Sequence, residues 1–215
     1  MALQVGPAGI VVLAPSRYPA GRIEDVIRSR AGWLRRHLER IEANRPTPLC
    51  HGATLFLRGE AVALEVEIDA LRVRPSVAEG AGVLHVHLPS RMCEGGAAVL
   101  GPLLRAHARK LAERELPERL AGFARALGRS APRVLIREQK RRWGSCAQDG
   151  TIRLNWRLIL LPPALADYVC AHEAAHLLVM DHSPRFWAVV ERLVPAWRPR
   201  RAELRRDAGA YLRLD

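Results

Sequence analysis

The stretch that most constrains this 215-residue chain is His172-Glu173-Ala174-Ala175-His176. On an α-helix, residues four apart lie on one face about a turn from each other, so both imidazoles can converge on one metal ion. Glu173 would then lie within reach of a water molecule on that ion. The pattern therefore requires a helix here, with one face open to a site.

The flanking residues predict that helix. Apolar residues recur at helical spacing from Leu165 to Val179. Pro162 and Pro163 suit the start of a helix, where the missing amide hydrogen costs nothing. We therefore expect both histidines to lie on a helix over residues 165–179.

A catalytic zinc ion takes three protein ligands and leaves its fourth position to water, and His182 is the nearest candidate for the third. A continuous helix would place it about 240° around the axis from His176. The chain must therefore turn back, which Met180-Asp181 could do, while Ser183-Pro184 is typical of the start of another helix.

Further motifs surround the histidines, between Arg133 and about Trp197. They are Arg142-Trp143-Gly144-Ser145-Cys146, Ile152-Arg153-Leu154-Asn155-Trp156, Tyr168-Val169 and His182-Ser183-Pro184-Arg185-Phe186-Trp187. Taken in this order, they resemble the YgjP-like family of zinc metallopeptidase-type proteins, which is related to the WLM and SprT-like zincins.

The resemblance implies that His172, His176 and His182 bind Zn²⁺ and that Glu173 is the catalytic carboxylate. Two features depart from the family. Ala174 stands where the family usually has leucine, which could loosen packing behind the metal helix. The chain also lacks the arginine-rich leading strand of many relatives, so we expect an incomplete sheet edge or a different start.

With zinc bound, the water pKa falls from 15.7 to roughly 7, and Glu173 would take the water proton and pass it to the leaving group. This predicts a zinc-dependent hydrolase that cleaves peptide bonds. Strand 151–156 could pair with an extended peptide as an edge strand, an expectation from the resemblance. Candidate substrate-binding residues are Arg142, Trp143, Asn155 and Arg185, although core packing explains Asn155 and Trp156 equally well.

Two other function classes stay open. Arginines flank the motifs, and guanidinium groups bind phosphate bidentately, so a metal-dependent nucleotide phosphohydrolase is the main alternative. These arginines are Arg141, Arg142, Arg153, Arg157 and Arg185. The third class is a nucleic-acid-associated or protein-binding module with structural zinc, for which Glu173 would be superfluous.

Composition bounds the partners and the compartment. The net charge of +12 comes almost entirely from arginine, which a composition biased to arginine and alanine explains. Weak nucleic-acid association through an Arg-rich surface stays open beside a polypeptide or nucleotide substrate, although the sequence contains no nucleic-acid module pattern. The four cysteines form no C-x-x-C pair, which favours free thiols in a reducing cytosol. Without a long apolar run or a basic leader, we expect a cytoplasmic protein with no membrane contact.

The pattern along the chain predicts an α+β fold. Residues 1–94 form a β-rich part with a strand over 9–14, one amphipathic helix over 23–43 and a hairpin around Arg58-Gly59-Glu60. Residues 95–215 form a zincin-like helical metal-binding part with a small sheet. Its expected elements are a helix over 97–127 interrupted at Pro117, strands over 133–138 and 151–156 separated by a loop, a helix over 184–194 and an Arg-rich tail.

Two smaller expectations concern metal ligation. His85 and His87 share one face of a strand, but they have no third ligand nearby and are better interpreted as surface or interface histidines. Metal-ligating histidines are usually oriented by a hydrogen bond to their second ring nitrogen. Asp167, Asp181 and Glu191 are the candidate acceptors of that bond.

Overall fold

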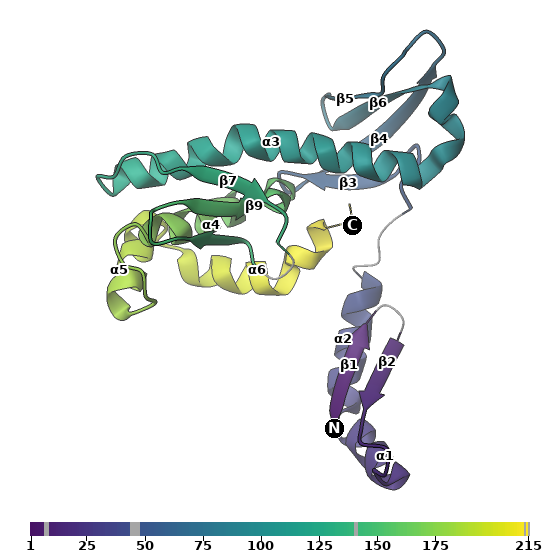
Figure 1. The fold of residues 1–215 in the computed structure, drawn as a ribbon, viewed down its shortest axis with the longest axis vertical. Helices are drawn as coiled ribbons and strands as arrows, with labels where there is room; N and C mark the ends of the chain where they lie inside the picture. The colour runs from purple at the N-terminus through teal and green to yellow at the C-terminus, as the bar shows by residue number, and fades with distance from the viewer. Residues whose placement is uncertain (7–8, 44–47, 140–141, 213, 215) are drawn as a thin grey trace. The chain divides into compact units, whose positions relative to one another are not determined.

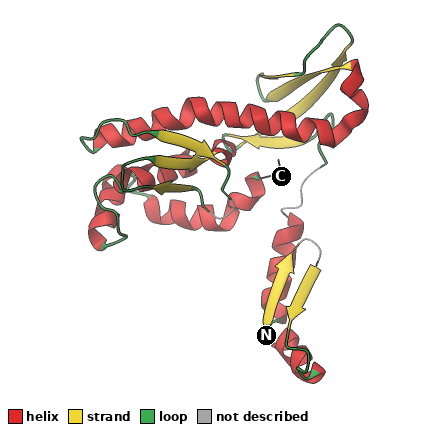
Figure 2. Ribbon diagram, in the orientation of Figure 1, coloured by secondary structure: helices red, strands yellow, loops and turns green. Residues whose placement is uncertain are grey.

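The computed structural model describes residues 1–6, 9–43, 48–139, 142–212 and 214. Its mixture of helices and small sheets confirms the predicted α+β class (Figure 2). The chain divides into two compact units, Met1–Arg45 and Pro46–Asp215. The boundary expected after residue 94 stays a prediction. Within the described ranges, no helix is both long and apolar enough to cross a bilayer.

The first unit pairs a two-stranded hairpin with two helices. Its elements are β1 (Ala2–Gly6), β2 (Gly9–Leu13), α1 (Ala20–Ser29) and α2 (Ala31–Ala43), and α2 contacts β1. The single helix predicted over 23–43 is therefore two, since the backbone at Arg30 departs from helical angles (φ −104°, ψ 8°). The strand predicted over 9–14 is β2, and a second strand, β1, precedes it. The two strands satisfy each other's backbone hydrogen bonds.

The second unit holds two sheets, and one long helix contacts both of them. The four-stranded sheet has the order β3-β4-β6-β5, and the three-stranded sheet has the order β7-β9-β8. Figure 1 shows helix α3 extending from the first sheet to the second. The elements are β3 (Thr54–Leu57), β4 (Glu60–Asp69), β5 (Ser76–Glu79), β6 (Val83–Pro89), η1 (Ser90–Gly95), α3 (Gly96–Ala126), β7 (Val134–Arg137), β8 (Gly144–Cys146), β9 (Ile152–Asn155), η2 (Trp156–Leu160), α4 (Pro163–Ala175), α5 (Pro184–Leu193) and α6 (Trp197–Tyr211).

The predicted hairpin is formed by β3 and β4. Arg58 and Gly59 in its turn both have positive φ, 52° and 78°, as a two-residue type I′ turn requires. The turn is also hydrogen-bonded to the segment before α4. The Arg58 amide donates to the Ile159 carbonyl (2.7 Å), and the Gly59 amide donates to the Leu160 carbonyl (3.0 Å). The four-stranded sheet is thereby attached to η2 and the start of α4.

The Arg58 side chain makes a second link, to α3 and β5. Its Nε and Nη2 donate to the two oxygens of Glu115, and its Nη1 donates to Glu79 at 2.6 Å. Hydrogen bonding to Arg58 lowers the pKa of Glu115. A half-buried ion pair therefore joins the hairpin to the long helix.

Helix α3 is continuous across Pro117, so the predicted interruption is wrong. Proline costs one backbone hydrogen bond in a helix interior. Here Leu116 and Leu120, on either side of it, are fully buried, and the packing of α3 on α4 offsets that cost. Gly128 ends the helix as predicted: it has φ of 68°, and Arg129 donates back to Ala124 in a Schellman motif.

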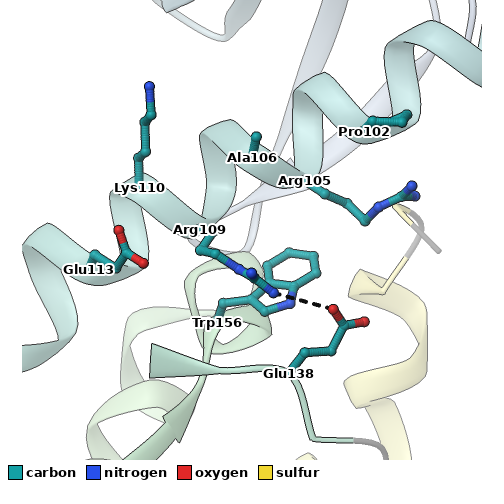
Figure 3. A pocket seen from close by; sticks show the side chains of 8 residues that line it. All are labelled: Pro102, Arg105, Ala106, Arg109, Lys110, Glu113, Glu138 and Trp156. Atoms are coloured by element: carbon teal, nitrogen blue, oxygen red, sulfur yellow. Dashed lines mark hydrogen bonds and ion pairs between the residues drawn. The ribbon is translucent and has the colours of Figure 1, made fainter. Parts of the chain in front are cut away.

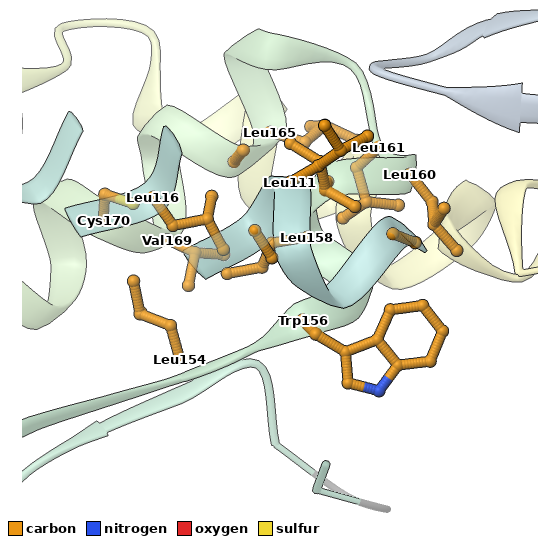
Figure 4. Packing of buried hydrophobic residues seen from close by; sticks show 14 of the residues in the cluster. Leu111, Leu116, Leu154, Trp156, Leu158, Leu160, Leu161, Leu165, Val169 and Cys170 are labelled. Atoms are coloured by element: carbon orange, nitrogen blue, oxygen red, sulfur yellow. The ribbon is translucent and has the colours of Figure 1, made fainter. Parts of the chain in front are cut away.

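One hydrophobic core joins α3, η2 and α4. Figure 4 shows Leu111 and Leu116 from α3 among side chains from η2 and α4. Leu165, Val169 and Cys170 are the α4 residues of this group, and each is at most 4% exposed. Burial of these apolar side chains holds the inner face of α4 against α3 and η2.

The three-stranded sheet corrects two predictions. Residues 144–146, expected in a loop, form strand β8 and pair antiparallel with β9. Strand β9 is therefore central, with β7 on its other side, so the prediction that it pairs with an extended peptide is wrong. The edge strand beside α4 is β8.

The Arg-rich tail is also a helix, α6, in which Trp197, Leu204 and Ala208 are buried. His85 and His87 lie on β6 and pair across the sheet with Glu65 and Glu67, each at 3.1 Å. Within the described residues, neither belongs to a group of three ligands.

Candidate metal centre

Helix α4 begins at Pro163, as predicted, and ends at Ala175, four residues earlier than predicted. The next residues complete one further turn, with the amides of Leu177 and Leu178 bonded to Ala174 and Ala175. The helix therefore still carries His172 and His176 on one face, with ring centroids 5.1 Å apart.

The chain then folds back, as the sequence predicted. An oxygen of Asp181 accepts a hydrogen bond from the Ser183 amide at 2.9 Å, which stabilises the turn. Helix α5 starts immediately afterwards at Pro184. His182 thus returns to the face of α4 that carries the other two histidines.

The reversal brings the three imidazoles together. Nε2 of His182 lies 3.2 Å from Nε2 of His172, and one ligand atom from each histidine lies within 4.8 Å of the others. Nitrogens bound tetrahedrally at 2.0–2.1 Å lie about 3.4 Å apart, close to the spacing of the first pair. Phe186, which is fully buried, packs against all three rings, with centroids 4.9, 4.5 and 4.8 Å away.

His172 and His176 have the charge state that a divalent ion needs. Burial lowers the pKa of His172 to about 3, with smaller contributions from the neighbouring histidines and Arg201. Burial also lowers the pKa of His176. Both rings are therefore neutral at pH 7, and a neutral imidazole nitrogen is a metal ligand.

The orientation of His176 is set by a backbone carbonyl. Its Nδ1 lies 3.0 Å from the Val179 oxygen, to which it donates, so Nε2 keeps its lone pair. None of the three carboxylates expected in this role takes it: Asp167 binds Arg119, Glu191 binds Arg198, and Asp181 binds the backbone. Nδ1 of His172 is buried without a hydrogen-bond partner in the described part of the chain.

Glu173 is 5% exposed and lies against the backbone of Gly144 on β8. Burial raises the pKa of the Glu173 carboxyl to about 8. The edge strand thus passes directly beside the carboxylate. Burial and the charge of Glu173 raise the pKa of the Cys146 thiol, on the same strand, to about 11. Among the described residues, Cys146 does not belong to the group of possible metal ligands.

Two cavities open beside His172 and share Trp143, Tyr168 and Leu204. The larger, about 550 Å³, continues past His182 to Trp187, Arg201 and Arg205, and we call it the arginine cavity. The smaller, about 250 Å³, is lined by Glu173, Gly144 and Arg142, and we call it the glutamate cavity.

The candidate substrate-binding residues have different positions. Trp143 lines both cavities, and Arg142 lines the glutamate cavity. Arg185 is exposed and lines neither. Arg157 donates to Glu138, away from the histidines, and Arg141 lies outside the described residues.

The structure gives Asn155 another role. Its Nδ2 donates to the carbonyls of Gln139 (2.8 Å) and Arg142 (3.1 Å), and its Oδ1 accepts from the Arg157 amide (3.1 Å). Asn155 is 3% exposed and makes all of these bonds to backbone groups, so it holds the loop before β8, as the core-packing interpretation expects.

Sequence reasoning did not select several residues that form the site. Gly144 and Phe186 stand within the motifs, but no local signal separates them from the other motif residues, because their contacts with Glu173 and with the histidines are tertiary. Arg201 and Arg205 were assigned to a tail. Their spacing of four, on a helix with Trp197 and Leu204 inward, could have placed them on one face.

Comparison with known proteins identifies the family. The family model described as "YgjP-like, metallopeptidase domain" matches residues 1–207. No curated protein matches. Among solved structures, the metallopeptidase zymogen of Pyrococcus abyssi abylysin is 31% identical, over 42% of this chain and 90% of that chain, with a TM-score of 0.38.

The family match covers both units and includes every residue of the histidine cluster. A metallopeptidase domain implies a bound metal ion and a hydrolase of that type, and the histidine cluster provides nitrogens that could hold the ion. The chain belongs to the YgjP-like family of metallopeptidase domains.

Proposed function

We propose that this protein is a zinc-dependent peptidase, in which His172, His176 and His182 hold Zn²⁺ and Glu173 is the general base. The main support for this proposal is that one nitrogen from each of the three histidines lies within 4.8 Å of the others. The buried Glu173 carboxylate comes from α4, the helix that carries His172. Three neutral imidazoles with an open fourth position are the ligand set of catalytic zinc. Imidazole also suits copper, iron and nickel, so the metal itself needs measurement.

A bound divalent ion would supply Lewis-acid chemistry, polarising the scissile carbonyl and lowering the pKa of water. A divalent ion beside Glu173 would favour its ionised form and so oppose the effect of burial, which alone raises its pKa to about 8. Glu173 would then accept the proton of the attacking water and deliver it to the leaving amine. The Glu173 carboxylate lies against the backbone of Gly144 and lines the glutamate cavity. This positioning supports a role in proton transfer.

The free edge of β8 supports an extended peptide as substrate. The Trp143 carbonyl accepts a hydrogen bond from the Asn155 amide, and the Ala147 amide donates to the Thr151 carbonyl. In an antiparallel pair, every second residue points its backbone N–H and C=O away from the partner strand. Gly144 and Cys146 therefore direct these groups away from β9. No described strand pairs on that side. A peptide added there would lie along the glutamate cavity.

The second candidate is a metal-dependent nucleotide phosphohydrolase. Arg142 at the glutamate cavity favours it, because guanidinium binds phosphate well. A module with structural zinc is the third candidate, and the buried Glu173 has no purpose in it. The peptidase ranks first because the β8 edge suits a polypeptide.

The test compares Glu173→Gln with the wild-type protein after zinc loading, with the metal content measured for both. Cleavage of an unstructured protein such as casein should fall by at least 100-fold while zinc stays bound. Glu191→Gln, on α5, is the matched control and should cleave normally. Unchanged cleavage in Glu173→Gln would reject the base, and phosphate release from nucleoside triphosphates without peptide cleavage would favour the second candidate.

A further inference from the structure

The arginine cavity contains two cations with no counter-charge. None of its lining residues is acidic. In the described ranges, no carboxylate makes an ion pair with Arg201 or Arg205, whereas the neighbouring arginines of α6 are paired. Those pairs are Arg198–Glu191 (2.6 Å), Arg200–Glu203 (3.0 Å) and Arg206–Asp207 (2.7 Å).

Arg201 is held in place by aromatic stacking. Its Cζ lies 4.8 Å from the ring centroid of Trp187, which stacks on the buried Trp197 at 4.3 Å and an interplanar angle of 16°. A guanidinium over the face of an aromatic ring leaves the N–H groups that point away from the ring free for a bidentate acceptor. Because stacking restricts the side chain beforehand, binding an anion costs less conformational entropy.

The stacked group lies beside the metal centre. The ring centroid of Trp187 is 5.8 Å from those of His172 and His182, and both histidines line the same cavity. The guanidinium carbon of Arg201 is therefore at most about 11 Å from either imidazole centroid, a span of about three residues in an extended peptide.

A second cavity with basic residues, along α3, also contains carboxylates and serves as a comparison. Figure 3 shows the cavity of about 480 Å³ along α3, where Arg105, Arg109 and Lys110 lie with Glu113 and Glu138. Arg109 donates to Glu138 at 3.3 Å. Carboxylates of the chain are part of that cavity, whereas the arginine cavity has none.

We propose that Arg201 and Arg205 bind a substrate carboxylate in the arginine cavity, so that the preferred substrates are peptides with an acidic group close to the scissile bond. This inference rests on the proposed peptidase function. The carboxylate can come from an Asp or Glu side chain or from the end of the peptide. A peptide is favoured over a nucleotide because the β8 edge offers backbone groups to an extended chain.

The experiment uses N-acetylated peptides that differ only in charge. One carries Glu and a C-terminal amide, one carries Gln and an amide, and one carries Gln and a free C-terminus. Zinc-loaded Glu173→Gln protein is titrated with each peptide and with a nucleoside triphosphate, following tryptophan fluorescence. Cleavage by the wild-type protein is measured in parallel as kcat/KM.

Binding and kcat/KM should favour either carboxylate-bearing peptide over the neutral one by about tenfold or more. Arg201→Gln and Arg205→Gln should each reduce this preference, and Arg201→Lys should restore it only partly because lysine lacks the planar fork. Arg198→Gln is the matched control: Arg198 also stacks on a tryptophan, at 4.6 Å, but lies outside the cavity. It should keep the full preference.

The failures can be told apart. Cleavage with equal kcat/KM for acidic and neutral peptides would overturn the carboxylate site and leave the peptidase standing. Absence of cleavage would reject the peptidase, and the binding titration would still decide the carboxylate preference. Tighter binding of the nucleoside triphosphate than of either acidic peptide would also overturn the proposal.

Discussion

A Cβ atom on Gly144 would lie 2.6 Å from Oε1 of Glu173, closer than side-chain carbon atoms come to other atoms in folded proteins. The edge strand and the carboxylate thus occupy contiguous space, and only glycine leaves room for both. The position of Glu173 therefore depends on a residue 29 positions earlier in the chain.

Gly144→Ala should displace the Glu173 carboxylate and lower kcat by about 100-fold, since a shift of about 1 Å at a catalytic group has that effect. Zinc content should stay normal because the histidines are not touched. Gly122→Ala is the control: nothing lies closer than 4.0 Å to its Cβ, and the α3 helix should gain about 0.5–1 kcal/mol. A Gly144→Ala enzyme with wild-type kcat would contradict this prediction.

Gly59→Ala should be strongly destabilising. Gly59 has φ of 78°, and its Cβ would lie 2.5 Å from Cα of Pro162, at the start of the metal helix. Gly52 has φ of 80° with nothing within 4 Å, so Gly52→Ala measures the backbone strain alone. Urea unfolding should show a loss of about 1–3 kcal/mol more for Gly59→Ala than for Gly52→Ala. Equal losses would mean that the turn can move away from α4.

Asn155→Leu should lower the free energy of unfolding by about 2–4 kcal/mol, because it leaves buried backbone groups without partners. Asn155→Asp keeps the acceptor for the Arg157 amide but turns a carboxylate oxygen toward two carbonyls, so it should be destabilised as well. Urea unfolding is the measurement, with the exposed Gln148→Ala as control. An Asn155→Asp protein of normal stability and raised KM would restore the substrate-contact hypothesis.

Glu115→Gln should show pH-dependent destabilisation. The pKa of Glu115 is lowered in the folded protein by Arg58, so its contribution is complete above the unfolded pKa of about 4.5 and is lost as the pH falls through the folded value. At pH 7 the variant should lose about 1–3 kcal/mol. Unfolding measured from pH 7 to pH 3.5 should show the difference shrinking, while Glu113→Gln stays near wild type. A difference independent of pH would exclude this linkage.

Zinc should stabilise the wild-type protein against heat, by about 4 kcal/mol at a free concentration 1,000 times the dissociation constant. Chelation should reverse the shift in Tm, because the three histidines of the proposed site come together only in the folded protein. His182→Ala should abolish most of the shift, and His85→Gln, on the outer face of the other sheet, should retain it. A full shift in His182→Ala would remove His182 from the ligand set.

Local sequence preferences were enough to predict part of this structure. The spacing of four placed His172 and His176 on one helix face, and Ser183-Pro184 marked the start of α5. Arg58-Gly59 indicated the hairpin turn. Each of these depends on a few neighbouring residues, whose backbone preferences act over about one turn.

The tertiary structure decided the rest, because packing between distant segments has no local signature. It made β8 the edge strand beside Glu173 and kept α3 helical across Pro117. It also replaced the expected carboxylates with the Val179 carbonyl at His176 and placed Arg201 of α6 beside the histidines. The sequence alone determined which residues can form a metal site, and the buried core between α3, η2 and α4 determined what surrounds it.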